Sequence, residues 1–160
     1  MPPFAQPASA DSNLLQVATL SPVEATEFPP GHAMLRAMTS YSGALLGESL
    51  RPDAVLDGIP LTVTKIYRAA LGNAAAGQPE LWTVIEFEVP ADRAPELAEA
   101  LSRLLLAGSW YCGFRSADEV FVVFSGRVFR YRRGDRAGRA RAEEYGRSAG
   151  VPEAQLDWPS

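Results

Sequence analysis

The clearest hydrophobic pattern lies in residues 110–131, where three short apolar and aromatic runs are separated by turn residues. Those runs are residues 110–114, 120–124 and 128–131. Ser125-Gly126, between the last two runs, is typical of a hairpin turn. Every residue from Val120 to Phe124 is apolar. A strand with one solvent-exposed face would instead alternate apolar and polar residues. We therefore predict three antiparallel strands, the middle one covered on both faces.

Two further strands are predicted upstream, over Leu61–Arg68 and Leu81–Val89. The first is rich in β-branched residues, and the second alternates in a way that gives it two distinct faces. Thr83, Ile85, Phe87 and Val89 share one face, and Trp82, Val84, Glu86 and Glu88 share the other. The loop of small residues between the two strands predicts that they pair as an antiparallel hairpin.

Helical periodicity predicts two helices in the same part of the chain. The first runs from about residue 92 to Gly108, and its apolar stripe is formed by Leu97, Leu101, Leu104 and Leu105. The second begins after Asp135, a typical N-cap residue, and ends near Ala149. Its packing face is formed by Gly138, Ala142, Tyr145 and Ala149.

The N-terminal part of the chain has a different character. Residues 1–30 contain many prolines and few apolar side chains, so regular structure is not expected there. A helical pattern follows from Gly31 to about Leu46, with Met34, Met38, Tyr41 and Leu45 on one face. We therefore divide the chain into residues 1–47, a proline-rich arm with a possible amphipathic helix, and residues 48–160, a single domain.

Taken together, these elements predict an α+β fold with a mainly antiparallel sheet of about five strands. The expected order is β-β-α-β-β-β-α, with the helices on one face of the sheet and an N-terminal arm. The second face of the central strand then needs other cover. The arm, its methionine-containing helix and another protein chain are the three candidates.

Three motifs in the C-terminal third resemble a set of small uncharacterised bacterial proteins. They are Trp110-Tyr111-x-x-Phe114, Phe124-x-Gly126-x-Val128-Phe129 and Tyr145-Gly146…Gly150-Val151-Pro152…Gln155-Leu156-Asp157-Trp158. The resemblance covers about residues 109–158. In that set an acidic residue precedes the phenylalanine of the first motif, where this chain has Gly113. The resemblance implies a shared fold and no assigned activity.

Composition and charge change this picture in two respects. The chain has one cysteine, and its first thirty residues hold no basic residue and no long apolar run. We therefore expect a cytoplasmic protein without a signal peptide or a membrane span. Its net charge is −4, but residues 127–147 hold eight arginines against three acidic residues. Such asymmetry indicates an electrostatic binding surface.

Metal and thiol chemistry find little support in the sequence. A single histidine, His32, and a single cysteine, Cys112, cannot form a common zinc or iron–sulfur site. A nucleophilic cysteine needs a group that stabilises its thiolate, and His32 is the only histidine available. We predict a buried structural Cys112, a surface His32 and no metal or cofactor.

Glu86 and Glu88 are the candidates for catalysis. They share one strand face and lie about 7 Å apart, a separation that suits general acid–base catalysis or an inverting glycosidase pair. Trp82 is on the same face and offers a stacking surface for a sugar or another ring. The simpler interpretation is a half-exposed polar face on an outer strand.

The arginines and the two methionines are the candidates for partner binding. We select Arg130, Arg132, Arg136, Arg139, Arg147, Met34 and Met38. One alternative function is a small enzyme or ligand-binding protein that uses the Trp82, Glu86 and Glu88 face. Binding of nucleic acid through the arginines of residues 127–147 is a second alternative, but the chain is acidic overall and has no nucleic-acid motif. Our leading hypothesis is a non-enzymatic protein-interaction module, an accessory subunit or an immunity- or antitoxin-like inhibitor, which binds itself or an acidic partner.

Overall fold

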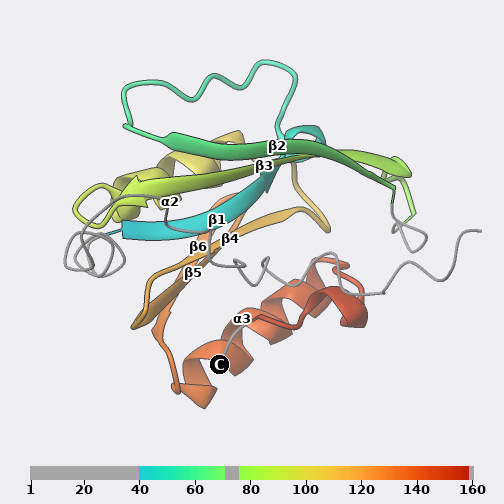
Figure 1. Ribbon diagram of the computed structural model, residues 1–160. Helices are drawn as coiled ribbons and strands as arrows, with labels where there is room; N and C mark the ends of the chain where they lie inside the picture. The colour runs from blue at the N-terminus through green and yellow to red at the C-terminus, as the bar shows by residue number, and fades with distance from the viewer. Residues whose placement is uncertain (1–39, 71–75, 159–160) are drawn as a thin grey trace, which may run out of the picture.

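A computed structural model describes residues 40–70 and 76–158 of the chain, which form one six-stranded antiparallel sheet. Across the sheet the strands follow the order β2-β3-β1-β4-β5-β6 (Figure 1). Their bounds are β1 Ser40–Leu46, β2 Thr62–Ala70, β3 Leu81–Pro90, β4 Tyr111–Arg115, β5 Glu119–Phe124 and β6 Arg127–Arg132. The α+β class and the antiparallel sheet are thus confirmed, with six strands in place of about five.

The additional strand is β1, and it corrects the helix predicted over Gly31–Leu46. Residues 40–46 are extended and lie between β3 and β4, near the middle of the sheet. The sheet therefore includes residues 40–46 of the predicted arm. Tyr41 and Leu45 are four residues apart, a spacing that puts side chains on one side of either a helix or a strand. The remainder of that predicted helix, with Met34 and Met38, lies outside the described residues.

One face of the sheet is covered by helix α2, Ala94–Leu104. The buried leucines of α2 pack on side chains from four strands. This core contains Tyr41, Leu45, Phe87, Val89, Cys112, Phe114, Phe121 and Val123. Phe114 and Phe121 lie opposite each other on β4 and β5, and their rings stack at 4.9 Å between centroids. Of the predicted leucine stripe, Leu97, Leu101 and Leu105 face the core, while Leu104 is half-buried. The helix ends at Leu104, earlier than the predicted Gly108.

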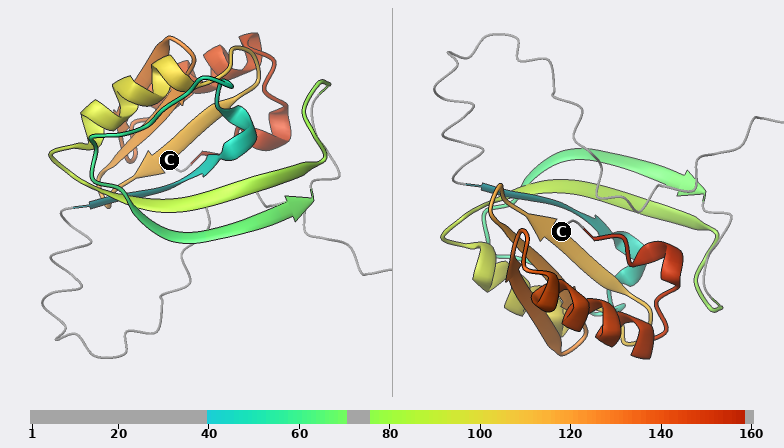
Figure 2. Two further views of the ribbon diagram at one scale, coloured as in Figure 1. Left: turned by 90° about the horizontal axis from the view of Figure 1, so that it is seen from above. Right: turned by 90° about the horizontal axis from the view of Figure 1, so that it is seen from below.

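The opposite face is covered by helix α3, Arg136–Ser148, and by the C-terminal segment that follows it (Figure 2). The second core is formed by Val120, Val122, Phe124, Tyr131, Ala142, Val151, Leu156 and Trp158. The prediction that both helices lie on one face is therefore wrong. Strand β5 is covered on both faces, as predicted, but it lies beside the edge strand β6 and not at the centre of the sheet. Both covers come from this chain, so β5 requires no partner protein.

Helix α3 lies close to the sheet because its inner positions are small. Gly138, Ala142 and Gly146 are buried on one stripe, while Tyr145 is half-buried. A Cβ atom added at Gly146 would lie 2.8 Å from Leu156 and 3.2 Å from Trp158. The predicted cap is confirmed, since the Asp135 carboxylate accepts a hydrogen bond from the backbone N–H of Gly138. Within the described ranges, no helix has the length and apolar character needed to cross a membrane.

Candidate functional site

The eight arginines of residues 127–147 do not form one surface. Arg130 and Arg132 lie opposite Phe121 and Glu119 of β5, so both point to the side of the sheet that α2 covers. Arg136, Arg139, Arg141 and Arg147 belong to α3 on the other side. A single face made from all the predicted arginines is therefore not observed.

Several of these arginines are already paired within the chain. Arg139 donates to Glu143 at 2.6 Å, and Arg147 donates two hydrogen bonds of 2.8 Å to Glu153. The first is a half-buried pair within α3, and the second is an exposed pair between α3 and the segment that follows it. An exposed pair of this kind contributes little to stability. Both pairs also occupy the guanidinium groups that a partner would need. Met34, Met38 and His32 lie outside the described residues.

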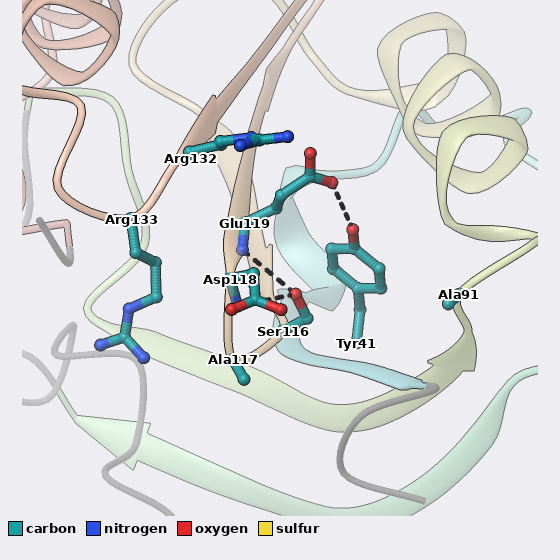
Figure 3. A pocket seen from close by; sticks show the side chains of 8 residues that line it. All are labelled: Tyr41, Ala91, Ser116, Ala117, Asp118, Glu119, Arg132 and Arg133. Atoms are coloured by element: carbon teal, nitrogen blue, oxygen red, sulfur yellow. Dashed lines mark hydrogen bonds between the residues drawn. The ribbon is translucent and has the colours of Figure 1, made fainter. Parts of the chain in front are cut away.

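A pocket of about 500 Å³ opens where the ends of several strands meet on the α2 side of the sheet (Figure 3). Tyr41 comes from the start of β1 and Ala91 from the turn before α2. The remaining lining residues are Ser116, Ala117, Asp118 and Glu119 from the β4–β5 turn, with Arg132 and Arg133 from the end of β6. The antiparallel order brings Tyr41 and Glu119 together although 78 residues separate them.

Glu119 is the centre of a short polar network at the wall of this pocket. Its Oε2 atom accepts a hydrogen bond of 2.7 Å from the Tyr41 hydroxyl and bonds of 3.1 and 2.7 Å from Arg130. The Arg130 guanidinium also lies 5.3 Å from the centroid of the Phe121 ring. Charge-assisted bonds of this kind are stronger than neutral ones and hold the three side chains in fixed positions.

The network shifts the pKa values of its members in opposite directions. The hydrogen bond from Tyr41, followed by those from Arg130, lowers the pKa of Glu119 below its ordinary value. Burial raises the pKa of Tyr41, and the bond to Glu119 raises it further. At neutral pH Glu119 is therefore ionised and Tyr41 keeps its proton, so Tyr41 acts here as a hydrogen-bond donor.

The β4–β5 turn is stabilised by hydrogen bonds within the turn and to the end of β6. The Ser116 hydroxyl oxygen accepts hydrogen bonds from the backbone N–H groups of Asp118 and Glu119, at 3.2 and 3.1 Å. The backbone N–H of Arg133 donates to the Asp118 carbonyl at 2.8 Å. These bonds tie the end of β6 to the turn, so the pocket wall is held on both sides.

The pocket is lined by two arginines, Arg132 and Arg133, and by two carboxylates, Asp118 and Glu119. Arg130 beside the pocket pairs with Glu119, so the two lining arginines outnumber the one remaining carboxylate, Asp118. Arg132 and Arg133 are exposed, and neither forms an ion pair with a carboxylate of the described residues. Figure 3 shows Arg132 pointing toward the end of Glu119 while Arg133 extends away from it. Burial lowers the pKa of the nearby Arg115, and the positive charge of Arg133 lowers it further. The site therefore favours an incoming anion.

The structure confirms only part of the candidate catalytic face on β3, which comprises Trp82, Glu86 and Glu88. Glu86 and Glu88 do share one face of β3, opposite Lys65 and Thr62 of β2. However, Trp82 is only 1% exposed, and its indole N–H donates to the Pro79 carbonyl at 2.6 Å. A buried ring cannot stack on a substrate, so the predicted stacking role of Trp82 is wrong.

Cys112 is buried, as predicted, in the core under α2. Burial raises the pKa of its thiol to about 12, so the thiolate is absent at neutral pH. Among the described residues, no group of three or more histidine, cysteine, aspartate or glutamate side chains is placed to hold a metal ion.

Comparisons with protein families, with curated proteins and with solved structures find no match to this chain. The resemblance in residues 109–158 therefore stays a prediction, and the functional argument depends on the site itself.

Two residues of this site are not predicted by the sequence pattern. The pattern places Tyr41 in a helix and gives Glu119 no role, whereas Arg133 belongs to the arginine-rich residues 127–147. Glu119 is the only charged residue of β5, whose other members are apolar, and that contrast was the available signal. The contact between Tyr41 and Glu119 could not be predicted from the sequence, because it depends on which strands are neighbours in the sheet.

Replacing Glu119 by glutamine is expected to lower the free energy of unfolding by about 1–2 kcal/mol at pH 7, because Arg130 loses its charged acceptor. The folded pKa of Glu119 lies below its ordinary value of 4.5, so its stabilising effect is present above that value. The effect is lost as the pH falls through the lowered folded pKa. Denaturant unfolding of both proteins at about pH 7 and pH 3 tests this, and the difference should shrink at pH 3.

Asp118→Asn is the matched control, since Asp118 is exposed in the same turn. It should change the free energy of unfolding little at either pH. A stability difference for Glu119→Gln that stays constant between the two pH values would contradict the role assigned to its charge.

Proposed function

We propose that this protein is a non-enzymatic interaction module that binds an acidic segment of a partner protein at the pocket between Tyr41 and Arg133. The observation that carries the proposal is the pair Arg132 and Arg133, exposed beside an open pocket and without ion-pair partners among the described residues. Guanidinium groups bind carboxylates through two parallel hydrogen bonds, which gives both strength and orientation.

The rest of the site supports binding more than catalysis. The one carboxylate at its centre, Glu119, has its Oε2 atom engaged by Tyr41 and Arg130. A general base must keep its carboxylate available to a substrate proton, and its pKa is normally raised toward neutrality. The pKa of Glu119 is instead lowered. Glu119 thus serves to position Arg130 and Tyr41 at the pocket wall.

Binding of nucleic acid receives less support, because the arginines lie on two sides of the sheet. The residues that add positive charge at the pocket are Arg130, Arg132 and Arg133. They flank a pocket rather than a long groove, and such a pocket suits a short acidic peptide segment or a chain terminus. An accessory subunit and an immunity- or antitoxin-like inhibitor are both roles in which such binding occurs.

The test is a titration of the full chain with a fluorescent hexaglutamate peptide, followed by anisotropy. Arg132→Glu combined with Arg133→Glu should weaken binding by about tenfold or more, since each lost charged hydrogen bond removes roughly 1.5–3 kcal/mol. Binding to the unaltered chain should also weaken as salt is raised.

The control carries the same charge change elsewhere on the molecule. Arg103→Glu combined with Arg141→Glu alters two exposed arginines, one on α2 and one on α3, away from the pocket. This control should keep most of the affinity. Equal losses in the two variants, or no binding of the peptide by the unaltered chain, would contradict the proposal. An affinity capture from native lysate with the same pair of variants would then identify the partner.

A further inference from the structure

Strand β2 is an edge strand that exposes apolar side chains. It lies at the opposite end of the sheet from β6, and seven of its nine residues are exposed. Ile66 is 63% exposed and Val63 is 51% exposed, and on the adjacent strand Leu81 is 46% exposed. An edge strand of this length offers a row of unpaired backbone groups to another strand.

The two edges of the sheet differ in how they would accept another strand. Edge strand β6 carries Arg127, Arg130 and Arg132, so most antiparallel registers of two copies would set arginine against arginine. Strand β2 carries only Lys65 and Arg68, with a bulge between Val63 and Lys65. The residues from Lys65 to Ala70 pair regularly with β3, and they present a regular edge.

We infer that β2 pairs antiparallel with β2 of a second copy of this chain, with Ile66 on the two-fold axis. In this register Ile66 faces Ile66 of the second copy, and Lys65 faces its Tyr67. The same ammonium already lies 4.5 Å from the centroid of the Tyr67 ring within one chain. Arg68 then lies opposite the bulge at Thr64, so no like charges meet.

Other registers are less favourable because they oppose like charges or place an apolar side chain against a charged one. Centring the pair on Lys65 sets lysine against lysine, and centring it on Arg68 sets arginine against arginine. Centring it on Tyr67 avoids like charges but places the exposed Ile66 against Arg68. The Ile66 register is the one that pairs the most exposed apolar residue of the strand with itself, which an isologous interface permits.

The expected dimer is weak, because one strand pair and a few apolar side chains make a small interface. Interfaces that bury less than about 1,200 Å² in total usually belong to transient complexes. The self-association is therefore expected at high protein concentration. This inference is independent of the proposed function, because β2 and the Arg132 pocket lie toward opposite edges of the sheet.

A cysteine placed on the two-fold axis gives the sharpest test. Directly opposed residues of an antiparallel pair have Cα atoms about 4.5–5.5 Å apart, which is within the range of a disulfide. Ile66→Cys should therefore form a covalent dimer under mild oxidation. The native Cys112 is buried and should not interfere.

Ala70→Cys is the matched control, since Ala70 is exposed on the same strand. In the inferred register Ala70 lies four residues from the axis, so two cysteines at position 70 would be roughly 25 Å apart. Little cross-linking is expected from this variant. Equal cross-linking of the two variants would indicate random collision and would overturn the inferred pairing.

Sedimentation velocity provides a measurement without cross-linking. The unaltered chain should show a rise in sedimentation coefficient between about 1 μM and about 1 mM, the range expected for a small interface. Ile66→Lys should abolish the rise, because it sets like charges on the axis. Val55→Lys, which alters a loop residue that is 69% exposed, should retain it. A chain that stays monomeric throughout would overturn the inference.

Discussion

Replacing Trp158 by alanine is expected to lower the free energy of unfolding by about 3–5 kcal/mol, the range measured for large buried aromatic residues. Trp158 is only 2% exposed and lies in the C-terminal segment that follows α3. Its ring packs edge-on against Tyr111 of β4 and Phe124 of β5, at 5.2 and 5.9 Å between centroids. Its removal leaves a cavity between the sheet and α3.

Denaturant unfolding at neutral pH measures this change, with Asp157→Ala as the control. Asp157 is the exposed neighbour of Trp158, and its replacement should change the free energy of unfolding by less than about 0.5 kcal/mol. A loss below about 1 kcal/mol for Trp158→Ala would show that the C-terminal segment does not complete the core under α3.

Replacing Gly43 by alanine is expected to cost about 3 kcal/mol, the upper end of the usual cost of overpacking. Gly43 lies opposite Phe114, in the middle of the sheet. A Cβ atom at this position would lie 2.5 Å from the Gly113 carbonyl oxygen and 2.9 Å from the Phe114 Cα atom. Because both atoms belong to the backbone, β1 and β4 would have to separate to admit the methyl group.

Gly113→Ala makes the same chemical change one strand away and serves as the control. A Cβ atom there would meet only the Phe121 carbonyl oxygen, at an ordinary 3.9 Å. Alanine at this position should be neutral or stabilising by up to about 1 kcal/mol, because glycine loses more backbone freedom on folding. Similar destabilisation by both substitutions would contradict the close β1–β4 approach.

The Gly43 contact also matters for the candidate site. Strand β1 carries Tyr41 at its start, and its pairing with β4 sets Tyr41 beside the β4–β5 turn. A displacement of β1 would therefore move the Tyr41 hydroxyl away from Glu119. We expect the binding pocket and the fold to respond together to Gly43→Ala, whereas Glu119→Gln should disturb the pocket with a smaller effect on stability.

The elements with strong local patterns were predictable from the chain itself. The leucine stripe of α2, the hairpin at Ser125-Gly126 and the cap at Asp135 each depend on neighbours within a few residues. The prediction for β1 was wrong because the spacing of Tyr41 and Leu45 fits both a helix and a strand. The residue that favours a strand is Gly43, because it allows close contact with Phe114, which lies 71 positions further along the chain.

The sequence alone determined that this chain folds as an α+β protein with an antiparallel sheet, an apolar run from Val120 to Phe124 and an arginine-rich C-terminal region. Those properties follow from residue types and short-range periodicity. The tertiary structure decided which face each helix covers and which arginines are already paired. It also decided that Tyr41, Glu119, Arg132 and Arg133 meet at one pocket. Strand order sets these outcomes, and strand order arises from packing between distant segments that no local pattern specifies.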